Sequence, residues 1–114
     1  MPDYGPYLGT VDSVHDGDTV NIALDVGFDL SVHTKVRVYG INAPELSSDA
    51  GKAAREFAKS LLKPGDQVTV VSKGWDKYGG RINGVINFSG GDYAERMIAA
   101  GHAKPWDGKG VKPI

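Results

Sequence analysis

The sequence predicts a small, mainly β domain with helices (α+β), in which five strands close into a barrel. Five segments are rich in β-branched residues, and the stretch between the third and the fourth repeats its apolar residues at helical spacing. A chain of 114 residues can build only one core, so the strands and the helix belong to one domain. The five segments span residues 8–14, 19–24, 32–39, 67–72 and 81–88.

Turn-forming residues separate the first three strands. Asp-Gly-Asp at residues 16–18 follows the first segment and Asp-Val-Gly at residues 25–27 follows the second. Strands joined by such turns form a meander. In the third strand Arg37 alternates with Val36 and Val38, which predicts that the arginine points to the face opposite the valines.

A helix is expected between the third and fourth strands. Ser47 or Ser48 provides its cap, and Lys-Pro-Gly-Asp at residues 63–66 ends it because proline cannot continue the helical hydrogen bonds. Three strands, a helix and two further strands are the order of the oligonucleotide/oligosaccharide-binding (OB) fold, a five-stranded barrel. Closure into a barrel also leaves no open edge strand.

A short C-terminal helix is expected after the fifth strand. It begins near Asp92, which forms a capping-box pattern with Glu95, and it ends at Gly101. The prolines and glycines of residues 104–114 predict a loop.

We expect one OB-fold domain over residues 1–114, with its core at about 8–106 and a tail at 107–114. No apolar run approaches the ~20 residues that a membrane span needs. The first residues lack the basic start and the apolar stretch of a secretory signal. The chain is therefore expected not to engage a membrane and to be either cytoplasmic or a mature, trimmed form. We also expect a monomer.

Charge is unevenly distributed along the chain, although its net value is only −1. Residues 1–34 contain six acidic residues and no Lys or Arg, whereas residues 35–114 contain all 13 basic residues and the other eight acidic ones. A molecule polarised in this way can hold a cation at one place and an anionic ligand beside it. Chance segregation is the alternative explanation.

Two short segments supply oxygen ligands for a cation. One is the turn at residues 16–18, and the other follows the third strand, where Pro44 restrains Ala43 to an extended conformation. If the segments adjoin at one mouth of the barrel, Asp18, Asn42 and the Ala43 carbonyl form an all-oxygen set that suits calcium or magnesium better than zinc. Taken alone, each segment is explained as a hairpin turn or a strand end.

Two arginines, Arg37 and Arg81, lie in predicted strands. Two guanidinium groups can clamp a phosphate through charge-assisted hydrogen bonds and stabilise the extra negative charge of a phosphodiester transition state. The alternatives are a solvent-facing strand residue for Arg37 and a charged edge residue for Arg81.

A set of short motifs occurs in order along the chain. They are VHDGDTV at 14–20, VRV at 36–38, INAPE at 41–45, DKYG at 76–79 with Arg81, and AGHA at 100–103. Through these motifs, over residues 8–106, the chain resembles the staphylococcal nuclease-like (thermonuclease) family. The resemblance implies an OB barrel that cleaves DNA and RNA with calcium and leaves 5′-hydroxyl and 3′-phosphate ends.

The resemblance also implies roles for single residues at the metal. Asp18 would be a calcium ligand, together with the side chain of Asn42 and the backbone carbonyl of Ala43. The family generally has aspartate where this chain has Asn42. The amide oxygen can still bind calcium, but the site loses one negative charge, so weaker calcium binding is expected.

The resemblance makes Arg37 and Arg81 the residues that bind the reacting phosphate. Glu45 would orient or deprotonate the attacking water as a general base. Gly80 is an apparent insertion before Arg81, and the residues of the following strand align Arg81 with the family's arginine.

Three further residues are candidates for substrate binding. Lys77 and Tyr78 would contact a neighbouring phosphate, and their alternative interpretation is that of ordinary loop residues. Trp106 would stack on a base, or alternatively seal the end of the barrel.

These observations lead to the hypothesis of a calcium-dependent endonuclease of low sequence specificity that acts on DNA and/or RNA. The alternative is a nuclease-like barrel with weakened catalysis that serves as a binding module for nucleic acid or protein. Basic residues on one side of the first helix could guide the polymer, although a solvated helix face explains them as well. They are Lys52, Arg55, Lys59 and Lys63.

Overall fold

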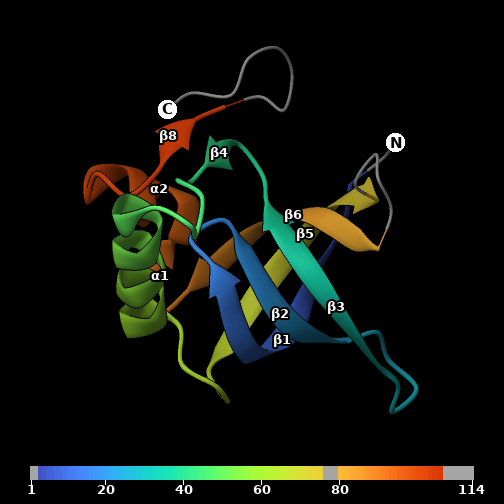
Figure 1. The fold of residues 1–114 in the computed structure, drawn as a ribbon. Coiled ribbons are helices and arrows are strands. Elements are labelled where there is room, and N and C mark those ends of the chain that lie inside the picture. The colour runs from blue at the N-terminus through green and yellow to red at the C-terminus, as the bar shows by residue number, and fades with distance from the viewer. Residues whose placement is uncertain (1–2, 76–79, 107–114) are drawn as a thin grey trace.

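The computed structural model describes residues 3–75 and 80–106, which form a closed barrel with two helices (Figure 1). The barrel strands are β1 (Tyr4–Asp16), β2 (Thr19–Asp25), β3 (Ser31–Val38), β5 (Gln67–Trp75) and β6 (Arg81–Phe88). They pair in the order β3-β2-β1-β5-β6, and β6 pairs back on β3, so the sheet closes on itself. The β3–β6 pair is parallel and the others are antiparallel. The predicted five-stranded OB barrel of the α+β class is therefore confirmed.

Side chains at alternate strand positions fill the barrel. On β5, Val68 and Val70 are buried, whereas Thr69 between them is exposed. Gly84 on β6 faces the same interior. A Cβ atom there would lie 3.0 Å from Cγ1 of Val36 and 3.1 Å from Cγ1 of Val70, so the missing side chain gives these two valines room at the centre.

Helix α1 (Asp49–Leu61) connects the third barrel strand to the fourth, as predicted. Ser48 is its cap, because the Ser48 Oγ accepts a hydrogen bond of 3.0 Å from the Gly51 N–H. The buried side of the helix consists of Gly51, Ala54 and Ala58. A side chain at Gly51 would overlap the backbone carbonyl of Glu45, so glycine is required for this close approach.

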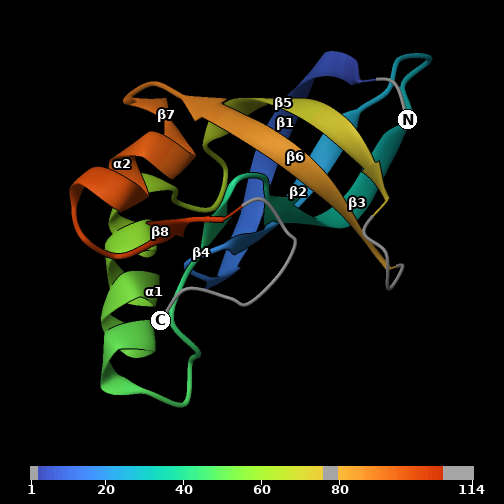
Figure 2. The same ribbon diagram turned by 90° about the horizontal axis from the view of Figure 1, so that it is seen from above.

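Helix α2 (Tyr93–Ala99) follows the short strand β7 (Gly91–Asp92), which pairs with the end of β6. The Asp92 carboxylate caps it by accepting a hydrogen bond of 3.2 Å from the Glu95 N–H, as the sequence pattern predicts. Figures 1 and 2 both place α1 and α2 together at one side of the barrel, away from the β2–β3 hairpin. Within the described ranges, neither helix is long and apolar enough to cross a membrane.

One sequence-based prediction for the C-terminal segment was wrong. Residues 104–106 were expected to be loop, but β8 (Lys104–Pro105) pairs antiparallel with β4 (Ile41–Asn42). The Trp106 N–H then donates to the Gly40 carbonyl at 2.8 Å. The segment that follows β3 thus gains a strand partner and is held over one end of the barrel. The predicted tail at 107–114 lies outside the described residues.

Candidate functional site

The Asp-Gly-Asp turn between β1 and β2 is held from three directions. The Asp18 N–H donates to Oδ1 of Asp16 at 3.1 Å, which closes the turn. The buried Tyr93 hydroxyl of α2 donates to the Gly17 carbonyl at 2.8 Å. A Cβ atom at Gly17 would lie 2.8 Å from the Cβ of Ala43, so the turn packs directly against the segment after β4. Its two carboxylates are therefore presented by a rigid backbone.

Asp18 connects this turn to the segment that follows β4. Its side chain is buried, and its Oδ2 accepts a hydrogen bond of 2.9 Å from the Ala43 N–H. The Thr19 hydroxyl lies 3.3 Å from the other oxygen, Oδ1. The two segments expected to adjoin at one mouth of the barrel are thus in contact, and Asn42, which precedes Ala43, ends β4 beside them. The roles of these residues as metal ligands remain predictions.

Arg37 points into this region rather than into solvent. It is only 8% exposed, and its Nη2 lies 3.6 Å from Oδ2 of Asp18. Its Nη1 donates to the Val38 carbonyl at 2.9 Å, and its guanidinium carbon lies 5.8 Å from the centre of the Trp106 ring. The interpretation of Arg37 as a solvent-facing strand residue was therefore wrong, because the chain around β8 covers it.

Arg81 lies on the strand next to Arg37 and on the same face. In the parallel β3–β6 ladder, Arg81 pairs with Lys35 and Asn83 pairs with Arg37. Paired residues project to the same side, as do residues two apart on one strand. The Cα atoms of the two arginines are therefore about 8 Å apart, from a strand spacing of ~4.8 Å and a two-residue rise of ~6.6 Å. Their side chains therefore start from neighbouring places on one face, and the clamping of one phosphate by both groups stays a prediction.

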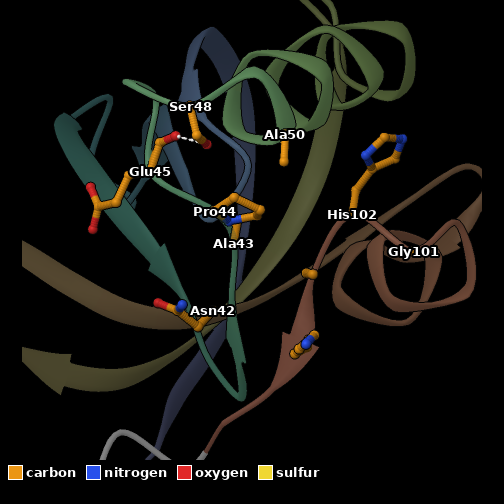
Figure 3. Close-up of a pocket in the computed structure, with 10 residues that line it drawn as sticks. Asn42, Ala43, Pro44, Glu45, Ser48, Ala50, Gly101 and His102 are labelled. Atoms are coloured by element: carbon orange, nitrogen blue, oxygen red, sulfur yellow. Dashed lines mark hydrogen bonds between the residues drawn. The ribbon is translucent and has the colours of Figure 1, made fainter. Parts of the chain in front are cut away.

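Glu45 lies between β4 and α1. Its backbone carbonyl accepts a hydrogen bond of 2.7 Å from the Ser48 hydroxyl, which fixes the backbone there. Its side chain is exposed, and Figure 3 shows the carboxylate on the same side of the chain as the Asn42 amide, pointing away from His102. The pocket drawn in Figure 3, of about 450 Å³, is lined by Glu45 and Asn42 as well as by Pro44, Ala50 and His102.

The acidic groups of the turn form a site that suits a hard cation. Burial and the neighbouring Asp18 carboxylate raise the pKa of Asp16 to about 6, because a second negative charge is unfavourable there. A divalent cation would relieve this repulsion. Within the described residues no three His, Cys, Asp or Glu side chains gather as a metal site. An ion would therefore need the Asn42 amide, a backbone carbonyl and water besides carboxylates, a set that calcium accepts.

The three predicted substrate-binding residues have different outcomes. Lys77 and Tyr78 lie outside the described residues, so their roles stay predictions. Trp106 lies next to the Arg37 guanidinium, where its ring shields the arginine from solvent. Its proposed contact with a base also stays a prediction.

Sequence reasoning missed one residue of this site. Tyr93 was treated only as part of the expected C-terminal helix, yet its hydroxyl holds the turn. A tyrosine at the first position of a helix carries no signal of a partner 76 residues away. The one available hint is that a buried tyrosine needs a partner for its hydroxyl group.

Comparisons with known proteins agree with this geometry. A family model described as "Staphylococcal nuclease homologue" matches residues 35–109. The chain is 36% identical over 112 residues to "Endonuclease YhcR" of Bacillus subtilis (strain 168), covering 87% of this chain and 9% of that protein. It is 30% identical over 106 residues to an "Uncharacterized endonuclease" of Escherichia coli O157:H7, covering 93% of this chain and 65% of that protein. The chain thus spans less than two thirds of the length of these relatives.

Proposed function

This chain belongs to the staphylococcal nuclease homologue family, and we propose that it is a calcium-dependent endonuclease that hydrolyses phosphodiester bonds of DNA and/or RNA. The observation that carries the proposal is the position of Asp18. Its buried carboxylate contacts both the Ala43 N–H and the Arg37 guanidinium, and this contact supports the proposal of a cation ligand beside a phosphate-binding group. The relatives named endonucleases support the same activity.

The reaction follows from the groups around this carboxylate. Asp18, the Asn42 amide and the Ala43 carbonyl would hold calcium, which when bound supplies Lewis-acid polarisation of the phosphoryl oxygens. Glu45 takes a proton from the attacking water as the new bond to phosphorus forms. The bond from phosphorus to the 5′-oxygen then breaks, and solvent protonates the leaving oxygen. The products are a 3′-phosphate and a 5′-hydroxyl.

Arg37 and Arg81 stabilise the charge that develops during this step. The transition state carries more negative charge than the diester, so donors placed on it lower the barrier. Arg37 is held by the Val38 carbonyl and by Asp18, so it needs little reorganisation. Because these contacts go to the phosphate rather than to the bases, we expect low sequence specificity.

A second candidate function rests on Asn42. An aspartate would add a charge that interacts with a cation by about 4 kcal/mol at ~4 Å and an effective dielectric of ~20, before solvent discount. Without it the cation is held less tightly. The alternative is therefore a binding module for nucleic acid or protein with weakened catalysis. Binding of the polymer without cleavage at saturating calcium would favour this alternative.

The test is cleavage of plasmid and single-stranded DNA, and of RNA, by the full chain in calcium and then in chelator. We expect cleavage only when calcium is present. In Glu45→Gln we expect the cleavage rate to fall by about 10²–10⁴-fold, the usual contribution of a general base. Glu56→Gln is the matched control, because Glu56 is an exposed residue of α1 that pairs with Lys59. Cleavage that persists in chelator would contradict the calcium requirement, and full activity of Glu45→Gln would contradict its role.

A further inference from the structure

Three outward residues of β3 and Tyr39, which directly follows the strand, form a row that passes through the proposed site. Val36 and Val38 are buried inside the barrel, so the odd-numbered residues around them face outward. We call the outward residues the β3 strip. They are His33, Lys35, Arg37 and Tyr39.

Lys35 stands beside the proposed phosphate-binding arginines. It is exposed, its Cα pairs with that of Arg81, and it lies two residues from Arg37 along β3. Two residues of a strand span ~6.6 Å, close to the separation of successive phosphates in an extended nucleic-acid strand. Lys35 has no ion-pair partner among the described residues, so its charge is available to a ligand.

Tyr39 stands on the other side of Arg37 along the same row. Its side chain is half exposed, and the ammonium group of Lys73 lies 5.2 Å from the centre of its ring. Lys73 is itself fixed by an ion pair of 2.7 Å with Asp3. The tyrosine ring is thus an exposed aromatic surface held in place beside the arginine.

The charges on the β6 side of the strip favour an anionic polymer, whereas on the β2 side Asp18 lies 3.6 Å from Arg37. None of the outward positions of β3 and of β6, its neighbour on that side, carries a carboxylate within the described residues. The row ends at His33, whose Nδ1 lies 2.8 Å from the Asp12 carboxylate, which offsets any positive charge on the ring. The basic part of the strip is therefore short and centred on Arg37.

We propose that the β3 strip binds the nucleotides that flank the reacting phosphate, with Lys35 on the adjacent phosphate and Tyr39 stacked on a base beyond Arg37. The proposal rests on the proposed function and extends it to a path for the polymer. Stacking on Tyr39 requires an unpaired base, so the ligand is a single strand of nucleic acid. This path differs from the basic side of α1, which the sequence also offers.

The proposal is tested by binding of a fluorescently labelled single-stranded 12-mer, measured by anisotropy in chelator so that nothing is cleaved. Lys35→Gln is expected to weaken binding and to lower the slope of log K against log salt by ~0.7, the value for one phosphate contact with a single strand. Tyr39→Ala is expected to weaken binding by roughly 5- to 100-fold, whereas Tyr39→Phe keeps the stacking ring and the affinity. Lys59→Gln on α1 and Phe28→Ala on the β2–β3 hairpin are the matched controls, since both residues are exposed and lie outside the strip.

Each outcome decides one of the two proposals. If Lys35→Gln and Tyr39→Ala keep the wild-type affinity and salt slope, the β3 strip does not bind the polymer, even if the protein cleaves DNA in calcium. The same holds if Lys59→Gln weakens binding as much as Lys35→Gln, because the path would then follow α1. Failure of the wild type to bind the 12-mer overturns the strip as well. If binding depends on Lys35 and Tyr39 but the protein does not cleave nucleic acid in calcium, the proposed nuclease activity is wrong and the proposed role of the β3 strip is supported.

Discussion

Replacing Tyr93 by phenylalanine removes one oxygen atom that holds the turn carrying Asp18. The tyrosine is fully buried, and its hydroxyl donates to the Gly17 carbonyl at 2.8 Å. Burial, followed by the nearby carboxylates of Asp18 and Asp16, raises the pKa of Tyr93 far above its usual range. The hydroxyl therefore stays protonated and remains a donor at every pH at which the protein would be studied.

The cost of this change follows from the burial of the acceptor. Without Tyr93 Oη the Gly17 carbonyl loses its partner inside the protein, and an unsatisfied buried polar group costs about 1–3 kcal/mol. In a domain of this size 1 kcal/mol lowers Tm by about 4 °C, so we expect a fall of roughly 4–12 °C. The turn also becomes less rigid, so the calcium concentration for half-maximal activity should rise.

The assay is thermal unfolding followed by circular dichroism, with a calcium titration of activity as the second measurement. Tyr39→Phe is the matched control, because Tyr39 is half exposed and water can replace any partner of its hydroxyl. Its Tm should change by less than about 2 °C. If Tyr93→Phe keeps the wild-type Tm and calcium response, the hydrogen bond to Gly17 does not stabilise the turn and the reasoning is wrong.

Three further substitutions test the site. Arg37→Lys replaces the forked guanidinium by a single ammonium group, and we expect kcat to fall by about 10²–10³-fold in steady-state cleavage; a wild-type kcat would remove Arg37 from catalysis. Asn42→Asp restores a negative charge, so the calcium concentration for half-maximal activity should fall at least about tenfold; an unchanged value would place Asn42 away from the ion. Gly51→Ala puts a Cβ atom onto the Glu45 carbonyl and should lower the free energy of unfolding, measured with denaturant, by about 1–3 kcal/mol. Ala53→Ser, on the exposed side of α1, is the control and should have little effect. Equal stability of the two variants would contradict this packing.

The barrel and both helix caps could be predicted because they depend on local patterns. Alternating valines define the strands, and Ser48 and Asp92 lie directly before the helices that they cap. The β4–β8 pair could not be predicted, because two residues are too few to show a period and Pro105 disfavours a strand assignment. The burial of Arg37 depends on that pair. Alternation placed its side chain on the outer face, but only the tertiary fold brings Trp106 over it.

Local patterns do not predict that the site residues lie close together in space. The composition of the turn and of the segment after β3 suggests oxygen ligands, but only chain topology decides whether they meet. Here the contact is made by Asp18, which accepts the Ala43 N–H, while its own carbonyl accepts the Val38 N–H at 2.8 Å. One residue thus ties the turn both to the last residue of β3 and to the residue that follows β4. A pattern of single residues cannot predict such a three-way contact.

The charges at the centre of the site separate the nuclease from the binding module. Asp16 and Asp18 together offset Arg37 and Arg81 at neutral pH, so these four groups offer a phosphodiester little net attraction. A bound divalent cation would make the same group of charges positive and favourable for the polymer. Of the other proposed site residues, Asn42 adds no negative charge, and the exposed Glu45 adds one. A nuclease site should therefore gain affinity for nucleic acid when calcium is added, whereas a binding module that uses only the β3 strip should bind equally with and without calcium.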